Sequence, residues 1–247
     1  MTAAEAGAAE EAGRQPPLWR RISHTLAAEI EAAGLKPGAR LHTEAQLAAR
    51  FDVNRHTVRR AIDSLVRRGL VRVEQGRGAF VADEVLDYEV SARTRFSEWI
   101  RRQNKVPEGQ VLRLRELGCP SAVAAPLGIA VGAPIVQLER LGLADGLPVA
   151  VTDHHFPLDR LPGLLEALRR APTITAALAE VGVDDYLRQS TRVAARMPTA
   201  TEAELLQLPR SRPLLVCENI NVDRSGTIIE FGVARYPSTR IQVVFEP

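Results

Sequence analysis

Residues 40 to 81 constrain the fold of this chain more than any other stretch. They read RLHTEAQLAARFDVNRHTVRRAIDSLVRRGLVRVEQGRGAFV. The pattern predicts a short capped helix, a tight turn, a second helix with arginines on one side, and a glycine-rich hairpin. That order is typical of a winged helix-turn-helix, which places its second helix in the major groove of DNA. The stretch therefore predicts a DNA-binding module.

Apolar spacing and capping residues predict three helices in this region. Thr43 and Gln46 have the spacing of a capping box, so a helix is expected to begin at Thr43. Asn54 suits the cap of the next helix, and residues 52–53 form the turn between the two. Two apolar stripes complete the expected core: Leu18, Ile22, Leu26 and Ile30 on a first helix over residues 18–33, and Val58, Ile62, Leu65 and Val66 on the third.

Basic residues gather at the start of the third helix. Arg55 and Arg59 lie four positions apart, with His56 and Arg60 beside them. On an isolated helix such a cluster is more often a solvated face. A recognition helix, however, reads bases mainly with its N-terminal residues, and arginine pairs well with guanine, so the position before a hairpin favours DNA contact. Arg77, between two glycines at the hairpin tip, is expected to reach a minor groove or a phosphate.

Charge is distributed unevenly along the chain. Residues 14–82 hold 13 Lys and Arg against 6 Asp and Glu, a net charge of +7 within a 247-residue chain whose total is +2. Such a basic block suits a module that binds a polyanion. We therefore expect a disordered acidic tail over residues 1–13, a DNA-binding domain over 14–82, a linker over the acidic segment 83–91, and a second domain over 92–247.

Several classes of protein are disfavoured by what the sequence lacks. No run approaches the roughly 18 apolar residues of a membrane helix, and the first residues lack the basic start and apolar stretch of a signal peptide. A cytoplasmic location without membrane contact is therefore expected. Cys119 and Cys217 form no CxxC pair, so no zinc site, disulfide framework or cofactor is indicated. His154 and His155 are strand neighbours that point to opposite faces, which disfavours a metal site.

The region after residue 91 mixes strands and helices without the regular alternation of a doubly wound sheet. Two hairpin turns are expected at Asp145-Gly146 and Ser225-Gly226. Strands are predicted over residues 109–117, 134–144, 147–156, 187–197, 213–223, 227–236 and 240–246, and short helices over 121–128, 158–169, 173–181 and 200–207. The pattern predicts an α+β domain with a largely antiparallel sheet.

The strand at residues 227–236 has the pattern of a pocket floor. Glu230 and Tyr236 share one face with Gly232 and Ala234, so two polar groups flank small residues that leave room for a ligand. An exposed strand face with polar ends is the alternative. Arg140 shares an apolar strand face and, if buried, needs an anionic partner. That partner is either Glu230, in a structural pair, or a ligand that both residues face.

Residues 17–82 resemble the GntR superfamily of bacterial repressors. The resemblance rests on the stretches 38–41, 43–44, 47–48, 54–59 and 76–81. It implies that the DNA-binding residues are Arg40, Thr43, Glu44, Asn54, Arg55, His56, Thr57, Arg59, Arg60, Gln75, Gly76, Arg77 and Gly78. Two positions depart from the family, which usually has proline in place of His42 and a DNA-contacting arginine in place of Ala45. The operator sequence is therefore not implied.

Residues 92–246 are similar to the effector domain of the HutC subfamily, the UTRA domain, which has a chorismate-lyase-like fold. The stretches 93–97, 138–141, 145–150 and 230–240 carry this resemblance, and 152–156 is similar to regulators of phosphonate metabolism. Many relatives carry arginine in place of Gly142 and glutamate in place of Thr152, so their sugar-phosphate ligands are disfavoured. The resemblance implies a phosphonate or phosphate held at a helix start, with Arg93, Arg95, Ser97, Arg140, Asp153, His155, Glu230 and Tyr236 around the effector.

The sequence thus predicts a ligand-responsive transcriptional repressor of genes for phosphonate or related organophosphate metabolism. Its expected partners are a double-stranded DNA operator, a small anionic metabolite and a second copy in a homodimer. One alternative is a HutC-type regulator of another metabolite, such as a sugar phosphate or an amino-acid derivative. Another is a constitutive DNA-binding dimer without an effector. An enzyme is disfavoured, because we find no nucleophile, base and acid in a catalytic pattern.

Overall fold

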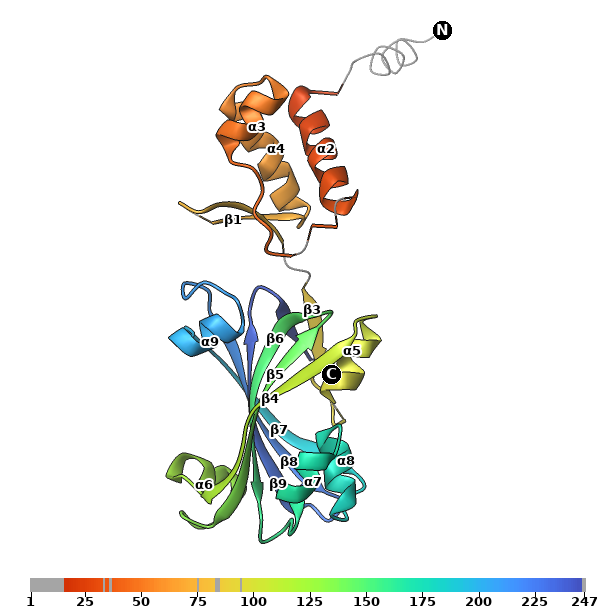
Figure 1. Ribbon diagram of the computed structural model, residues 1–247, viewed down its shortest axis with the longest axis vertical. Helices are drawn as coiled ribbons and strands as arrows, with labels where there is room; N and C mark the ends of the chain where they lie inside the picture. The colour runs from red at the N-terminus through yellow and green to blue at the C-terminus, as the bar shows by residue number, and fades with distance from the viewer. Residues whose placement is uncertain are drawn as a thin grey trace, which may run out of the picture. The chain divides into compact units, whose positions relative to one another are not determined.

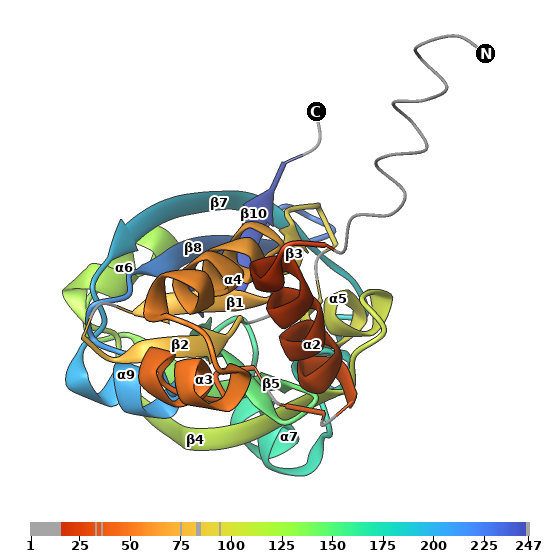
Figure 2. The same ribbon diagram turned by 90° about the horizontal axis from the view of Figure 1, so that it is seen from above.

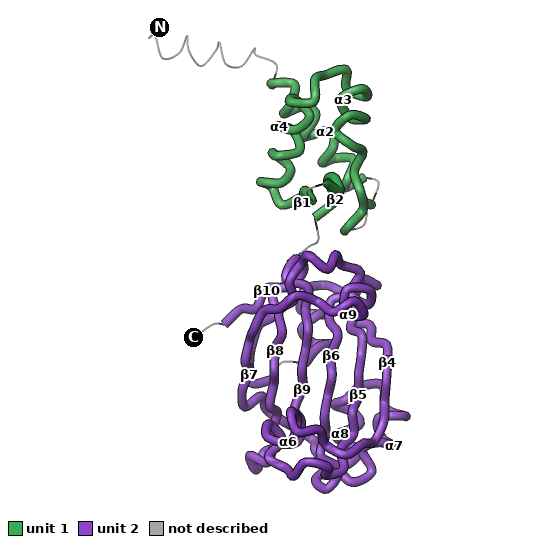
Figure 3. The backbone as a smooth tube through the Cα atoms, turned by 90° about the vertical axis from the view of Figure 1, so that its left-hand side faces the viewer, with its two compact units in different colours: residues 1–84 green, residues 85–247 purple. Residues whose placement is uncertain are grey.

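The computed structural model describes residues 16–32, 34–35, 37–74, 76–82, 85–93 and 95–245. The chain divides into two compact units, residues 1–84 and 85–247 (Figure 3). The tail expected over residues 1–13 lies outside the described residues. In the described ranges, no helix is long and apolar enough to cross a membrane.

The first unit packs helices against a two-stranded hairpin (Figure 1). Its elements are α2 (Leu18–Ala32), α3 (Glu44–Phe51), α4 (Arg55–Arg67), β1 (Val71–Glu74) and β2 (Gly78–Val81). Both predicted caps are confirmed: Thr43 and Gln46 form a full capping box, and the Asn54 side chain accepts from the Thr57 N–H. These caps fix where α3 and α4 begin and therefore which residues stand at their N-termini.

The core of this unit forms where the apolar stripes of the helices meet the hairpin. Its buried members include Ile22, Leu26, Ile30, Leu47, Val58, Ala61, Ile62, Leu65, Val71 and Val81. The expectation for Val66 is wrong, because this side chain is 40% exposed. Ala61 completes the buried stripe of α4 instead. Because this stripe packs into the core, the basic residues at the start of α4 lie on the opposite, solvent-facing side of the helix.

The second unit is built on a six-stranded antiparallel sheet of order β4-β5-β6-β9-β8-β7, with β4 and β7 at opposite edges (Figure 2). Helices α5, α7 and α8 lie on one face of the sheet and α6 and α9 on the other (Figure 1). The strands are β4 (Pro107–Gly118), β5 (Pro134–Ala144), β6 (Leu147–Pro157), β7 (Tyr186–Arg196), β8 (Leu214–Asp223) and β9 (Ile228–Pro237). The helices are α5 (Phe96–Arg102), α6 (Ser121–Leu127), α7 (Leu164–Arg170), α8 (Ile174–Glu180) and α9 (Ala200–Leu205). The predicted α+β class is confirmed.

Part of the segment expected to be a linker belongs to the second unit. β3 (Leu86–Glu89) pairs in parallel with β10 (Ile241–Val244). Leu86 and Tyr88 are buried, while Asp87 and Glu89 point outward. The acidic residues thus form the solvent side of an alternating strand, and the expectation of a linker is wrong for residues 86–89.

Arg240 binds three backbone carbonyls from two other segments of the second unit. Its Nη1 donates to the carbonyl oxygens of Pro148 at 2.8 Å and Leu206 at 2.7 Å, and its Nη2 donates to that of Gln207 at 3.2 Å. Methionine has a similar length but no donor, so these oxygens would lose their partners. We expect Arg240→Met to lower the free energy of unfolding by about 2–4 kcal/mol.

Urea denaturation of the full chain measures this effect. Arg210 is exposed, and Arg210→Met is the matched control, with an expected change below about 0.5 kcal/mol. Equal stabilities of the two variants would contradict the role assigned to Arg240.

Candidate effector cavity and nucleic-acid interface

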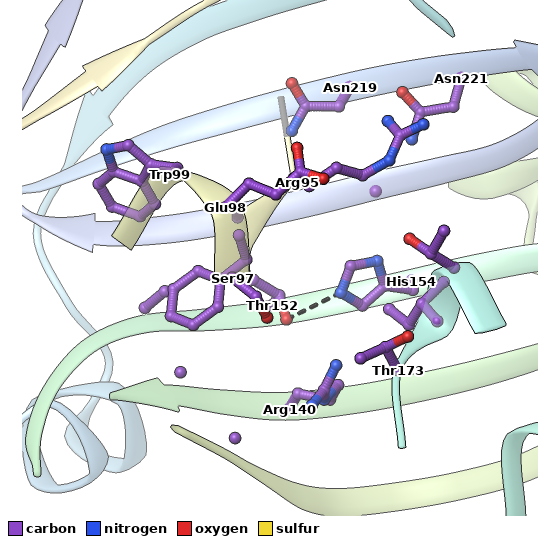
Figure 4. A pocket seen from close by; sticks show the side chains of 18 of the residues that line it. Arg95, Ser97, Glu98, Trp99, Arg140, Thr152, His154, Thr173, Asn219 and Asn221 are labelled. Carbon is purple, nitrogen blue, oxygen red and sulfur yellow. Dashed lines mark hydrogen bonds between the residues drawn. The ribbon is translucent and has the colours of Figure 1, made fainter. Parts of the chain in front are cut away.

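A cavity of about 350 Å³ lies over the face of the sheet that α5 and α8 cover (Figure 4). Gly232 and Ala234 of β9 form the middle of its floor, as the period-two pattern predicted. Thr152 pairs with Ala234 and His154 with Gly232 in the neighbouring strand β6. Because residues in register on adjacent strands share a face, side chains from β5, β6, β8 and β9 all reach this cavity.

Arg140 is a half-buried cation of the cavity wall. It stands opposite Thr152 in the register of β5 and β6. Its Nε is buried without a hydrogen bond, and burial lowers the pKa of the Arg140 guanidinium. Its Nη2 lies so close to Gly109 of β4 that a Cβ there would clash. Among the described residues no carboxylate pairs with Arg140, so the wall has an unbalanced positive charge.

Glu230 is the buried carboxylate of the same cavity, and it pairs with residues other than Arg140. Its Oε1 lies 2.5 Å from His154 Nδ1, and its Oε2 accepts from Asn221 Nδ2 at 2.6 Å. Burial opposes ionisation, but these hydrogen bonds outweigh it and hold the pKa of the Glu230 carboxyl below its usual value. The structural pair that we considered between Arg140 and Glu230 is therefore absent from the described contacts.

Arg188 is a second half-buried guanidinium, at the side of the cavity formed by β7 and β8. Its Nε donates to Asn221 Oδ1 at 2.7 Å, and its Nη1 to Asn219 Oδ1 at 2.6 Å and to the Tyr88 hydroxyl at 3.2 Å. Burial acts against the charge, but Tyr88 and the field of Glu230 outweigh it and raise the pKa of Arg188. The donors of this residue are thus directed at neutral oxygens.

The start of α5 supplies the cavity's covering wall. The Phe96 ring packs on Gly142, where a Cβ would lie 2.7 Å from the ring's Cζ. This close approach brings Ser97 and Trp99 to the cavity. Arg95 also lines it, but its guanidinium lies over the Tyr186 ring at 3.5 Å, and its Nη2 donates to the Tyr186 carbonyl at 3.0 Å. Its charge therefore has protein partners already.

Aromatic rings close one end of the cavity. Tyr236 lies 5.1 Å from Tyr88 between ring centroids, and Tyr88 lies 5.1 Å from Trp99. Burial raises the pKa of the Tyr236 hydroxyl well above its usual value, so this residue stays neutral. The expected position of Tyr236 in the cavity wall agrees with the structure, although its partners Tyr88 and Trp99 were not foreseen.

Three of the expected effector residues lie outside the cavity. Asp153 faces the other side of the sheet, where it pairs with Arg235 and accepts from Gln137 Nε2 at 3.3 Å. His155 is buried on that side too and donates to the Phe231 carbonyl at 3.2 Å; burial lowers the pKa of its ring. Both expectations are wrong because successive side chains of a strand point to opposite faces, and Thr152 and His154 are the residues of β6 that face the cavity.

Arg93 is the third of these residues. It is exposed and pairs with Asp185 at 2.7 Å, outside the cavity lining. The next residue, Thr94, lies outside the described residues.

Sequence reasoning also missed residues that do line the cavity. The same strand alternation places Thr152 and His154 there, and it could have been read from the register with Arg140. Asn219 and Asn221 lie across the floor from them (Figure 4). The position of Arg188 could also have been predicted, because it lies two residues after the buried Tyr186 on the same strand and so shares its face. Among the described residues no group of three His, Cys, Asp or Glu could hold a metal ion.

The first unit presents basic side chains at the N-terminus of α4. Arg55 and His56 are exposed. Arg59 is also exposed, and it donates to the Glu44 carboxylate of α3 at 2.9 Å, which joins the two helices. Arg60 lies over the Trp19 ring of α2 at 4.7 Å, so its guanidinium is oriented by stacking. A helix start with exposed arginines can meet base edges and phosphates of a major groove.

Other expected DNA-binding residues have structural partners. The hydroxyl of Thr43 and the side chain of Asn54 cap their helices, and Thr57 donates its hydroxyl to Asn54 Oδ1 at 3.0 Å. These three residues therefore fix where the helices begin. We expect them to contact DNA only through atoms that the capping hydrogen bonds leave accessible.

The hairpin tip has the backbone that its glycines predict. Gly76 and Gly78 have φ of 73° and 114°, a region open mainly to glycine. Arg77 is exposed and pairs with Glu74 at 2.6 Å. Arg40 lies against Gly78, where a Cβ would be 3.4 Å from the arginine Nε. Gln75 lies outside the described residues.

A helix-turn-helix with a wing and a second unit with a polar cavity define a class: DNA-binding regulators that carry an effector domain. Comparison with known families agrees. Residues 18–81 match the bacterial regulatory proteins of the gntR family, and residues 102–242 match the UTRA domain. The chain belongs to the GntR family and carries a UTRA effector domain of the HutC type. It is therefore a transcriptional regulator that binds DNA and a small-molecule effector.

The chain is similar to several named regulators along nearly its whole length. It is 32% identical to the probable transcriptional regulator PhnF of Escherichia coli K12, over 94% of this chain and 95% of that protein. It is 27% identical to the transcriptional repressor PhnF of Mycolicibacterium smegmatis, over 84% of each chain. The crystal structure of PhnF from Mycobacterium smegmatis matches with a TM-score of 0.63 and 25% identity, over 92% of this chain and 98% of that one. The relatives are named as regulators and none as an enzyme.

Glu202 anchors α9 on the face of the sheet opposite the cavity. Arg196 donates to both oxygens of its carboxylate, at 2.7 and 2.6 Å, and Arg235 Nε lies 3.0 Å away. The hydrogen bond from Arg196 lowers the pKa of Glu202 to about 2 from 4.5. A lowered folded-state pKa stabilises the protein above the unfolded value, and this stabilisation is lost as the pH falls from 4.5 towards 2.

We therefore expect Glu202→Gln to lower the free energy of unfolding by about 2–3 kcal/mol at pH 7 and much less at pH 3. Urea denaturation at both pH values measures the difference. Glu204→Gln, an exposed neighbour on α9, should change it by less than about 0.5 kcal/mol. A loss for Glu202→Gln that is independent of pH would contradict the ionic origin of the effect.

Proposed function

We propose that this protein represses genes of phosphonate or related organophosphate metabolism and releases its operator when a phosphonate or phosphate monoester enters the cavity. The observation that carries the proposal is the half-buried guanidinium of Arg140, whose buried Nε has no hydrogen bond and which has no carboxylate partner among the described residues. A buried charge of this kind is costly unless an anion meets it. A ligand phosphonate supplies that anion, and guanidinium binds it with paired hydrogen bonds.

The surroundings of Arg140 support an oxyanion in this place. The Ser97 and Thr152 hydroxyls line the same cavity and are hydrogen-bond donors. Arg95 is on the lining too, although its partners Tyr186 and Asp185 make it a secondary contributor to the anion site. The names of the PhnF relatives, one of them a repressor, favour phosphonate chemistry and repression for this chain.

The DNA side of the proposal uses α4 and the wing. A homodimer in the cytoplasm would present two α4 helices to major grooves about one helical turn apart on a near-palindromic operator. The effector would favour a domain arrangement whose helix spacing no longer fits that operator. A difference of a few kcal/mol in effector affinity between the two arrangements is sufficient for release.

Arg55→Ala and Arg59→Ala test the DNA interface. Each removes an exposed guanidinium at the start of α4, so each should cost about 1–3 kcal/mol of specific binding. Gel shifts on the promoter of the chain's own operon measure the loss. Arg67→Ala, an exposed change in the last turn of α4, should cost less than about 0.5 kcal/mol. Unchanged affinity in both test variants would refute the helix assignment.

Arg140→Met tests the anion site. Methionine keeps an apolar stem but removes the charge, so the affinity for methylphosphonate or inorganic phosphate should fall at least about tenfold. Calorimetric titration of the full chain measures it. Arg93→Met is the control, because Arg93 pairs with Asp185 outside the cavity lining. Equal affinities of the two variants would show that the anion binds elsewhere.

A further inference from the structure

The cavity has two ends of opposite charge. Arg140 stands in the cross-strand row of Thr152 and Ala234. Glu230 lies four residues further along β9, beyond Gly232, and pairs in register with Asn221. The row of His154 and Gly232 lies between the two charges. A ligand that places an anion at Arg140 therefore extends along the floor towards a buried carboxylate.

The carboxylate is open to the floor because of Gly232. A Cβ on Gly232 would lie 3.2 Å from Glu230 Oε1 and 3.8 Å from His154 Nδ1. With hydrogen in that place, the oxygen lies directly over the centre of the cavity floor. A carboxylate has about four acceptor positions. The described hydrogen bonds from His154 and Asn221 use two of them, so positions remain for a ligand donor.

The contacts of Glu230 within the protein come from a few neighbouring residues. His154 Nδ1 lies 2.5 Å from Glu230 Oε1, and His154 Nε2 lies 3.0 Å from the Thr152 hydroxyl oxygen. Asn221 is a neutral donor. The Arg188 guanidinium is directed at Asn219, Asn221 and Tyr88, and none of the described hydrogen bonds joins it to Glu230. The fields of His154 and Arg188 also lower the pKa of the Glu230 carboxyl and favour its ionised form, so its remaining acceptor positions suit a charged ligand donor.

We propose that the effector is a zwitterion of the aminoalkylphosphonate class, with its phosphonate on Arg140 and its protonated amine on Glu230. This inference rests on the proposed anion site and adds the chemistry of the other end of the ligand. Glu230 is then the residue that selects amines, and the hydrogen bond to His154 positions its carboxylate. Alkylphosphonates of the same length satisfy Arg140 but leave Glu230 without a charged partner.

Matched ligand pairs test the amine without any change to the protein. The full chain is titrated by calorimetry with 2-aminoethylphosphonate against n-propylphosphonate, and with 3-aminopropylphosphonate against n-butylphosphonate. The expected result is that the better-fitting amine binds at least about tenfold tighter than its alkyl partner. 2-Hydroxyethylphosphonate separates charge from hydrogen bonding and is expected to fall between the two.

Glu230→Gln tests whether Glu230 causes the preference for amine ligands. Glutamine keeps the shape and an acceptor oxygen but removes the charge, so the preference for amines should disappear while inorganic phosphate still binds. Thermal unfolding of the variant confirms that it is folded. Equal binding of amine and alkyl ligands by the unaltered chain would overturn this inference and leave the anion site intact. Failure of every phosphonate and of phosphate to bind would overturn the proposed function as well.

Discussion

A half-buried arginine, Arg140, that has no carboxylate partner among the described residues is the constraint on which the proposed effector site depends. A protein gains nothing from a desolvated guanidinium unless another group meets it, because an unpaired buried charge destabilises the fold. Other charges of the second unit have described partners: Glu202 pairs with Arg196, Asp153 pairs with Arg235, and Arg188 and Arg240 donate to neutral oxygens. The proposed role of Arg140 as a ligand-binding charge rests on this contrast.

Strand alternation divides these two roles between the faces of one sheet. Thr152 and His154 face the cavity, while Asp153 and His155 face the side that α6 and α9 cover. The small residues Gly232 and Gly142 are needed on the cavity face, since one leaves the floor open and the other admits the Phe96 ring. The proposed ligand contacts and the contacts within the protein therefore come from neighbouring residues on opposite faces of the sheet.

Much of the fold could be predicted from the sequence because its signals are local. The caps at Thr43 and Asn54, the wing glycines and the period-two strands each depend on a few neighbouring residues. β3 was missed because its acidic residues read as a linker, although Leu86 and Tyr88 alternate inward. The site was predicted in part: Arg95, Ser97, Arg140, Glu230 and Tyr236 line the cavity, whereas Arg93, Asp153 and His155 do not. Strand alternation turns Asp153 and His155 to the opposite face of the sheet. Arg188 and the His154–Glu230 pair depend on the order of strands in the sheet, which no local pattern specifies.

The most direct measurement of the central claim is a crystal structure of the full chain grown with a phosphonate. The account predicts phosphonate oxygens within about 2.7–3.0 Å of the Arg140 guanidinium, the length of a charge-assisted hydrogen bond. A phosphonate bound on the outer surface near Arg93, with Arg140 still lacking an anion, would contradict it.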